Sequence, residues 1–284
     1  MATFDFSTTN ELKLLSEVVG DLAPILETHD IRFMVIGATA RDLLLRHGYG
    51  IQIDRGTEDV DFAVMIDHWD HYETLRSALI KAGNFSARSK TAHHRLRHRT
   101  DLPLDLVPFG KIERPDRTIV WPPDHAVVFD CFGVAEAFAA SLEVTLPGDR
   151  LILVPRIAAL ALLKIAAWYD RQRDSDNRDA QDLALYMQKY LDCGNFDHAA
   201  ANHPDIFEDD DYDHEIAGAR LLGRDIAELL DAQGIDRCLK VLLPEADADA
   251  RMLLARQSGV ALERACALIQ ATCDGLAELP ARGS

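Results

Sequence analysis

Two aspartates spaced two residues apart precede an apolar, strand-like segment of the chain. Asp59 and Asp61 are followed by Phe62-Ala63-Val64-Met65-Ile66. Residues i and i+2 of a strand project from one face, so the two carboxylates should point together from a rigid element. Like charges on one face repel unless a cation lies between them. Oxygen ligands without nearby Cys or paired His suit Mg²⁺ or Mn²⁺, so the pattern predicts a divalent metal site.

The surrounding sequence distinguishes this Asp-x-Asp pattern from the others in the chain. The same spacing also occurs at 174/176, 209/211, 211/213 and 247/249. Only Asp59 and Asp61 open an apolar run that is typical of a strand. The alternative interpretation is structural, with the two aspartates at a strand end paired with Arg41 or Arg55.

A third carboxylate is available to complete this site from a neighbouring strand. Asp105 lies in the alternating segment Leu102–Phe109, which predicts a strand. Its prolines, Pro103 and Pro108, favour a short strand or one near a sheet edge. We therefore predict that Asp59, Asp61 and Asp105 are the catalytic carboxylates and the metal ligands, with Asp105 also a candidate general base.

A glycine turn lies about 20 residues before the aspartate pair. Gly37 follows the short apolar segment 32–36, and a helix start is predicted around Thr39. Free backbone N–H groups at such a start can face an anion, and Arg41 could add a guanidinium. The turn therefore predicts a phosphate site. The alternative, a plain turn after a strand, needs no ligand.

Together these residues resemble the nucleotidyltransferase superfamily with the polymerase-β-like fold, and more narrowly the AbiEii/MenT group of bacterial nucleotidyltransferases. The resemblance covers about residues 31 to 191. The segments that carry it are Gly37-Ala38-Thr39, Thr57-Glu58-Asp59-Val60-Asp61 and Leu104-Asp105-Leu106-Val107.

This resemblance implies transfer of a nucleoside monophosphate from a nucleoside triphosphate to an acceptor hydroxyl, with Mg²⁺ or Mn²⁺ as cofactor. It implies nucleotide binding by Gly37, Ala38, Thr39 and Arg41. Superfamily members often have Ser or a second Gly where this chain has Ala38, so only Thr39 is left to supply a hydroxyl to the phosphates. A degenerate module that binds nucleotide or a partner without turnover is the alternative that this substitution favours.

A second set of candidate residues lies in the C-terminal half. Lys164 interrupts an apolar helical stretch, and Arg171, seven residues later, shares its face. The resemblance implies that Lys164 and Arg171 bind the nucleotide and that Asp179 holds one of them in place. Alternatively, Lys164 extends to solvent, and ordinary surface pairs form among Arg178, Asp179 and Asp182.

The net charge limits the polyanions that the protein can bind. With 30 Lys and Arg against 47 Asp and Glu, the formal charge is −17, which excludes broad coating by nucleic acid. The dense basic stretch from Arg88 to Arg99 is a candidate path for RNA, or alternatively a solvated hairpin. The resemblance implies an RNA acceptor such as the end of tRNA, and a protein antitoxin as partner. The acidic surface favours a small-molecule or protein acceptor instead.

The elements that must position these residues follow from hydrophobic periodicity. We predict a first domain, residues 1–150, with a mixed β-sheet flanked by helices, and an all-helical domain, residues 151–284, so that the fold is of the α+β (α/β) class. The boundary is expected at Leu146-Pro147-Gly148-Asp149. Helices are predicted at 10–29, 71–81, 156–171, 178–191, 214–232, 246–257 and 260–276, and strands at 32–36, 60–66, 102–109 and 118–121.

Composition sets the remaining expectations. Apolar residues make up 48% of the 284 residues, enough for globular cores. No apolar run approaches the ~20 residues of a membrane-spanning helix, and the N-terminus lacks the pattern of a secretory signal, so a cytoplasmic protein without membrane contact is expected. The five widely spaced cysteines are expected to be reduced core thiols.

Overall fold

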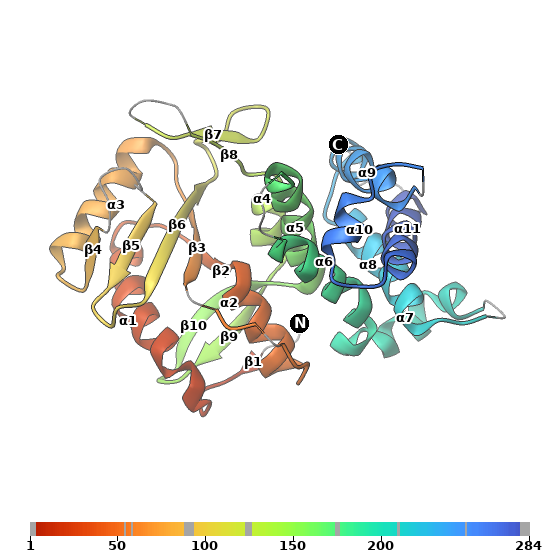
Figure 1. Cartoon of the computed structure of the whole chain (residues 1–284). Coiled ribbons are helices and arrows are strands. Elements are labelled where there is room, and N and C mark those ends of the chain that lie inside the picture. The colour runs from red at the N-terminus through yellow and green to blue at the C-terminus, as the bar shows by residue number, and fades with distance from the viewer. Residues whose placement is uncertain are drawn as a thin grey trace. The chain divides into compact units, whose positions relative to one another are not determined.

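The chain forms two compact units, Met1–Arg156 and Ile157–Ser284 (Figure 1). The computed structural model describes residues 4–53, 55–57, 59–87, 94–122, 127–173, 177–208, 211–247 and 249–278. The boundary between the two units lies after a β-hairpin, whereas the predicted boundary lies within it. β9 (Ser141–Leu146) pairs antiparallel with β10 (Arg150–Pro155), so the segment expected to be a domain boundary is the hairpin's turn.

A five-stranded mixed sheet is the centre of the first unit. Its order is β2 (Phe33–Ile36), β3 (Val60–Met65), β6 (Pro103–Phe109), β5 (Arg95–His98) and β4 (Phe85–Ala87). Only β3 and β6 are parallel. In Figure 1, β6 runs between β3 and β5. Phe62, Ala63 and Val64 are fully buried, as expected of a central strand covered on both faces. The predicted mixed sheet is therefore confirmed.

Helices of the first unit pack apolar stripes against this core. α1 (Lys13–Thr28) buries Leu15, Val18, Val19, Leu22 and Leu26, spaced three and four residues apart. The remaining helices of the unit are the 3-10 turn Asn10–Leu12, α2 (Gly37–Asp42) with its π-helical continuation Leu43–Gly48, α3 (Trp69–Lys81) and α4 (Val134–Ala139). The helices predicted at 10–29 and 71–81 are confirmed.

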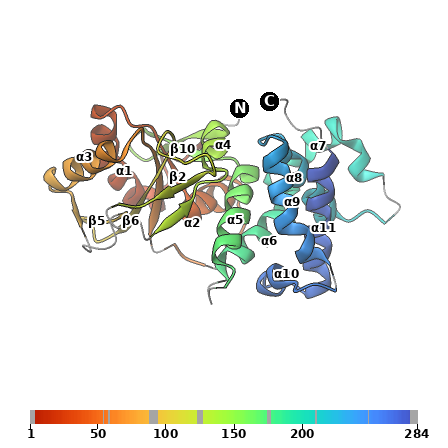
Figure 2. The same ribbon diagram turned by 90° about the horizontal axis from the view of Figure 1, so that it is seen from above.

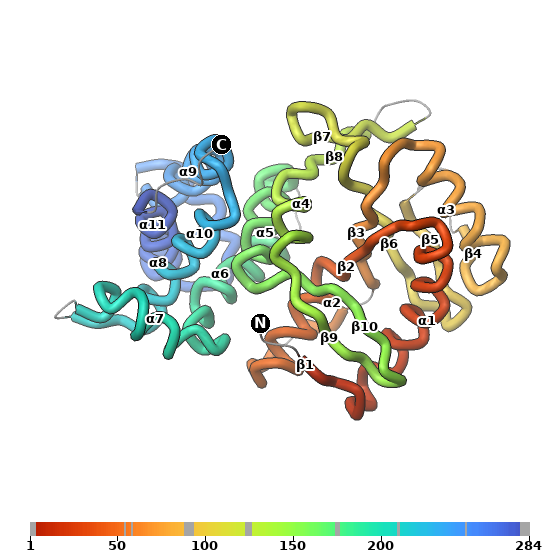
Figure 3. The backbone as a smooth tube through the Cα atoms, turned by 180° about the vertical axis from the view of Figure 1, so that it is seen from behind, coloured from red at the N-terminus to blue at the C-terminus, as the bar shows by residue number. Residues whose placement is uncertain are grey.

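Two smaller sheets complete the first unit. β1 (Phe4–Asp5) runs parallel to β9, which lies between β1 and β10 (Figure 3). β7 (Thr118–Val120) pairs with β8 (Val128–Asp130). The sequence patterns did not predict β1, β4, β5, β8, β9 or β10 as strands.

The second unit is helical, as predicted. Its helices are α5 (Ile157–Arg171), α6 (Arg178–Lys189), α7 (Phe196–Asn202), α8 (His214–Ala227), α9 (Ala232–Ala246), α10 (Leu253–Gln257) and α11 (Leu262–Glu278), with a π-helical segment Leu191–Asn195 and a 3-10 turn Pro204–Phe207. The helix predicted at 246–257 is wrong. One helix ends at Ala246, and the next begins only at Leu253, after Met252 in a left-handed conformation.

Two glycines let α8 and α11 pack side by side at close range (Figure 2). A Cβ on Gly223 would lie 2.1 Å from the carbonyl oxygen of Thr272, and one on Gly275 would lie 1.9 Å from that of Arg220. No side chain fits at either position without moving a backbone. The two helices therefore contact each other through their main chains.

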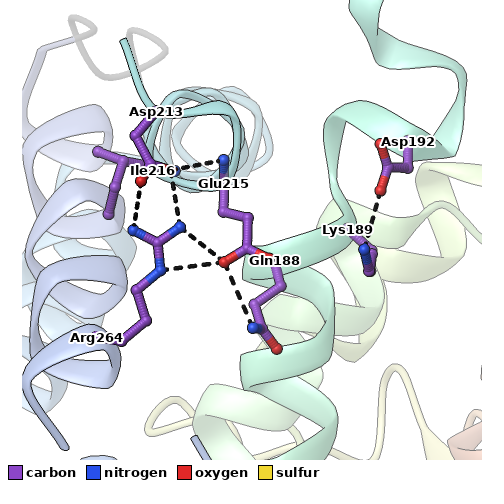
Figure 4. A network of polar contacts seen from close by, with 7 residues as sticks. All are labelled: Gln188, Lys189, Asp192, Asp213, Glu215, Ile216 and Arg264. Atoms are coloured by element: carbon purple, nitrogen blue, oxygen red, sulfur yellow. Dashed lines mark hydrogen bonds and ion pairs between the residues drawn. The ribbon is translucent and has the colours of Figure 1, made fainter. Parts of the chain in front are cut away.

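Arg264, near the start of α11, binds two carboxylates at the start of α8 (Figure 4). Its guanidinium donates two hydrogen bonds of 2.7 Å to the carboxylate of Asp213, and it also binds Glu215. The same Asp213 carboxylate caps α8 by accepting the backbone N–H groups of Glu215 and Ile216. One aspartate thus stabilises a helix start and anchors α11 to it.

This aspartate should make stability depend on acidic pH. The hydrogen bonds from Arg264 are the main cause that lowers the pKa of Asp213 to about 2. A carboxyl group with a depressed folded-state pKa adds stability above its unfolded pKa and loses it as pH falls. The unfolding temperature of the wild type minus that of Asp213→Asn, which keeps a capping oxygen, should be constant above about pH 4. We expect this difference to shrink between pH 4 and 2 in thermal scans; a constant difference across that range would contradict the assignment.

All five cysteines are free, and every one except Cys266 is buried. Within the part of the chain that the structure describes, no helix has both the length and the apolar composition needed to cross a bilayer.

Candidate active site

Strand register places three charged residues in a row across the central sheet. Asp61 on β3 lies beside Asp105 on β6, and Asp105 lies beside Arg95 on β5. Directly paired residues share a face of the sheet and have neighbouring Cβ atoms. Two carboxylates and one guanidinium are therefore adjacent because of backbone pairing. Asp59 lies one residue before β3, at the same end of the strand.

Asp61 lies against the glycine turn. Gly37 begins α2 with a φ of +68°, a conformation that costs a glycine little. A Cβ at this position would stand 2.2 Å from Oδ2 of Asp61. The carboxylate thus occupies the space that any other residue at position 37 would fill. The sequence predicts that the turn and the acidic strand belong to one site, and the structure brings Gly37 and Asp61 into contact.

Hydrogen bonds fasten the turn to the segment that carries Asp59. The hydroxyl of Thr39 donates to the backbone carbonyl of Asp59 at 3.2 Å, and the hydroxyl of Thr57 donates to the Asp42 carboxylate at 2.7 Å. The guanidinium of Arg41 donates to the other oxygen of Asp42 and is only 2% exposed. In this structure Arg41 and Thr39 therefore hold the site's backbone together, and their role in phosphate binding stays a prediction.

Arg95 links the other two carboxylates. Its Nε and Nη2 donate to the two oxygens of Asp105 at 2.7 and 2.5 Å, and Nη2 lies 3.3 Å from Oδ2 of Asp59. The hydrogen bonds that the guanidinium donates to Asp105 are the largest influence on it and raise the pKa of Arg95. Charges of Asp59 and Asp61 act in the same direction, so all three carboxylates influence one cation.

In the sequence, Arg95 is distinguished only as part of the basic stretch from Arg88 to Arg99. The signal that predicts a strand here is the alternation of apolar or buried positions with charged ones. Leu96 and His98 are buried, while Arg95 and Arg97 are partly exposed. A tight turn at Arg99–Leu102 then returns the chain into β6. Strand pairing across that turn would have placed Arg95 opposite Asp105.

The donor set suits a hard divalent cation, but it is not assembled around a single point. Carboxylate oxygens are the ligands that Mg²⁺ prefers. Among the residues that the structure describes, no three potential ligands converge as a ready metal site. Asp61 faces the turn, whereas Asp59 and Asp105 face Arg95. The chemistry fits a metal on condition that Arg95 releases oxygens to it.

In the second unit, the predicted lysine is part of a buried ionic cluster. Lys164 Nζ lies 2.8 Å from oxygens of both Asp179 and Asp182. Asp179 also accepts a 2.6 Å hydrogen bond from Arg171. The side chain of Lys164 is 14% exposed and that of Asp182 only 1%, so the alternative of ordinary surface pairs is wrong. Asp179 contacts both cations that the resemblance associates with it.

Removing the lysine from this cluster should destabilise the second unit. Lys164→Met removes the cation that Asp179 and Asp182 share and leaves Arg171 bound to Asp179, which costs roughly 3 to 5 kcal/mol of unfolding free energy. Urea denaturation measures this loss. Lys189→Met is the matched control, because Lys189 pairs with Asp192 at the surface and should lose less than about 1 kcal/mol. Equal losses for the two variants would contradict a buried cluster.

The described part of the basic stretch is engaged by carboxylates of the same unit. Arg97 pairs with Asp101, Arg99 with Glu17 and Asp21, and the buried His98 with Asp21. Residues 88–93 of the predicted RNA path lie outside the described residues. The charges of residues 95–99 are thus largely neutralised within the chain.

Comparison with known proteins identifies one matching family. The family described as "Nucleotidyl transferase AbiEii toxin, Type IV TA system" matches residues 22–256. No curated protein matches the chain. The crystal structure of ANT(2")-Ia in complex with adenylyl-2"-tobramycin is similar at 13% identity over 64% of this chain and 90% of that chain, with a TM-score of 0.37.

Two further solved structures are similar at the same low level. A candidate nucleotidyltransferase from H. pylori has 15% identity over 94% of this chain and 97% of that chain, with a TM-score of 0.36. A Thermotoga maritima CCA-adding enzyme complexed with tRNA has 12% identity over 95% of this chain and 82% of that chain, with a TM-score of 0.25. These scores are too low to support an inference about substrate.

Proposed function

The chain belongs to the AbiEii family of toxin-type nucleotidyltransferases, and from this premise we propose that it is a metal-dependent enzyme that transfers a nucleoside monophosphate to RNA. The donor is a nucleoside triphosphate and the acceptor is a hydroxyl at the end of a tRNA. The biological role is that of the toxin in a toxin–antitoxin pair, with a protein antitoxin as partner.

One observation carries the catalytic part of this proposal. Asp61 lies against the turn at Gly37. With Asp59 and Asp105 it forms a group of carboxylates at one end of the interior strands β3 and β6, the carboxylate edge. A helix start can bind phosphate, and a carboxylate edge can bind the cation that accompanies phosphate. Their contact supports a triphosphate bound between the turn and the edge.

The chain's residues then have distinct tasks. The backbone around Ala38 and Thr39 binds the phosphates, and Gly37 permits Asp61 to lie beside them. A divalent cation held by Asp59, Asp61 and Asp105 would neutralise phosphate charge and stabilise the pyrophosphate that leaves. The acceptor oxygen forms a bond to the α-phosphorus, the bond from that phosphorus to the pyrophosphate oxygen breaks, and the hydroxyl proton passes to Asp105.

The second unit contributes to nucleotide binding in this proposal. Lys164 and Arg171 carry positive charge beside Asp179. Asp179 holds both side chains in place, which lowers the entropy that they lose on binding a triphosphate or base. The support for this assignment is the resemblance of this segment to the family, together with the ion pairs of Asp179 with Lys164 and Arg171.

Incubation with labelled triphosphates tests the reaction and the acceptor together. The full-length protein is mixed with each α-labelled nucleoside triphosphate, Mg²⁺ and total tRNA. We expect labelled tRNA from the wild type, and none from Asp59→Asn or in the presence of EDTA. Label on a small molecule or on the protein alone would overturn the RNA acceptor. Triphosphate binding without any transfer would instead support a sensing module, the alternative that is favoured by Ala38 at a position where superfamily members often have Ser or Gly.

Induced expression in a bacterial host tests the toxin role separately. The wild type should slow growth, and Asp59→Asn should not, at equal protein levels. Equal growth of the two cultures would remove the toxin role without affecting the enzymatic proposal.

A further inference from the structure

The positive charge at the carboxylate edge comes from the chain itself. Arg95 lies opposite Asp105 in the register of β5 and β6, so backbone pairing fixes the contact. Both Asp105 oxygens accept hydrogen bonds from the guanidinium, and its Nη2 lies 3.3 Å from Asp59. Asp61 and Asp105 are directly paired like charges, which destabilise a sheet unless a cation is near.

A divalent cation at this edge would use oxygens that already have a partner. Two-point binding to a guanidinium engages both oxygens of a carboxylate. Both oxygens of Asp105 are engaged in this way, and Oδ2 of Asp59 is close to the same nitrogen. The guanidinium and the divalent cation therefore cannot both use the full set of oxygens at once.

We propose that Arg95 is a positioning residue that binds Asp59 and Asp105 in the metal-free protein and competes with the divalent cation for their oxygens. The inference rests on the proposed metal-dependent function and adds a determinant of metal affinity to it. Arg95 balances the carboxylates before the cation arrives, and its departure is part of the free energy of metal binding.

Exposure makes that departure feasible. The side chain of Arg95 is 34% exposed, so its guanidinium can turn to solvent without leaving a buried, uncompensated charge. Arg41, in α2, is 2% exposed and bound to Asp42, and it lacks this freedom. Arg95 is thus the described cation suited to exchange with a metal.

Manganese binding to the metal-free, full-length protein tests the inference directly. We compare wild type, Arg95→Gln and Arg97→Gln by calorimetric titration with Mn²⁺ alone. Arg97→Gln removes the same charge from the same strand, and its partner Asp101 is 80% exposed and outside the carboxylate row. We expect Arg95→Gln to bind Mn²⁺ about tenfold more tightly than wild type, since charge-assisted contacts no longer compete. Arg97→Gln should bind as the wild type does.

Thermal unfolding provides a second readout, which does not depend on enzymatic activity. Without metal, Arg95→Gln should unfold at a lower temperature than wild type, because the carboxylates repel one another. Saturating Mn²⁺ should raise its unfolding temperature by more than it raises that of the wild type. Arg95→Lys keeps a charge but loses the two-point contact, so its affinity should lie between those of wild type and Arg95→Gln.

The outcomes separate this inference from the proposed function. Mn²⁺ binding by wild type with equal or weaker binding by Arg95→Gln would overturn the competition and leave the metal site intact. Absence of Mn²⁺ binding in all variants would overturn both. If Arg95→Gln does not fold, Arg95→Lys decides the question, because its dissociation constant must then be smaller than that of wild type.

Discussion

Asp61→Asn is expected to reduce nucleotidyl transfer by about a thousandfold while the protein remains folded. Electrostatic stabilisation by a metal at phosphate amounts to several kcal/mol, and each 1.4 kcal/mol or so is about tenfold in rate. Asparagine keeps the size of the side chain beside Gly37 but not its charge. Because Asp61 is paired directly with Asp105, loss of one like charge should not lower the unfolding temperature.

The matched control for this variant lies beyond the other end of β3. Asp67→Asn is the same change at an exposed aspartate that pairs with Lys111. It should retain transfer within about twofold of wild type, since surface pairs contribute little. Both variants are assayed for label transfer and thermal unfolding in parallel. A fully active Asp61→Asn, or an equal loss in Asp67→Asn, would contradict the carboxylate edge as the catalytic centre.

Gly37→Ala should lose about a hundredfold in transfer with only a modest loss of stability. An alanine Cβ would stand 2.2 Å from Asp61 Oδ2, so the carboxylate has to rotate away from the turn. The end of a short side chain moves more easily than backbone, and the main stability cost is therefore the positive φ, about 1 kcal/mol. Displacing a catalytic group by about 1 Å costs on the order of a hundredfold in rate.

Gly50 provides a control with the same backbone geometry. Its φ is +69°, close to the +68° of Gly37, and nothing lies within 4 Å of the Cβ that an alanine would add. Gly50→Ala should therefore lose a similar free energy of unfolding and keep its activity. Urea denaturation and label transfer, measured on both variants, separate backbone strain from displacement of Asp61. Similar activity in the two alanine variants would show that the carboxylate's place at the turn is unimportant.

The elements that carry the glycine turn and the aspartate pair could be predicted because each has a strong local signal. From Phe62 onward β3 is a continuous apolar run, and Phe62, Ala63 and Val64 are fully buried, as expected of a strand covered on both faces. Gly37 ends a short apolar segment, and its positive φ explains why glycine stands there. These signals located Asp61 and the turn, but not their contact, which depends on how β2 pairs with β3.

The features that the sequence patterns do not predict depend on contacts between residues far apart in the chain. β5 is rich in arginine and histidine because its charges meet carboxylates on other elements, whereas composition alone suggests either a path for RNA or a solvated hairpin. The break between α9 and α10 depends on buried Glu245, whose carboxylate accepts the backbone N–H of Leu254 at 2.7 Å. Helical periodicity has no means of registering such a contact, and so the segment 246–257 was predicted as one helix.

The hairpin at the end of the first unit decides where the chain can be cut. A fragment that stops at residue 150 would discard β10 and leave β9 with a row of unsatisfied amides and carbonyls along one side. Such an open strand invites pairing with other molecules, so that fragment should precipitate. A cut after Arg156 retains the complete hairpin, and it is the truncation to make when the first unit is wanted by itself.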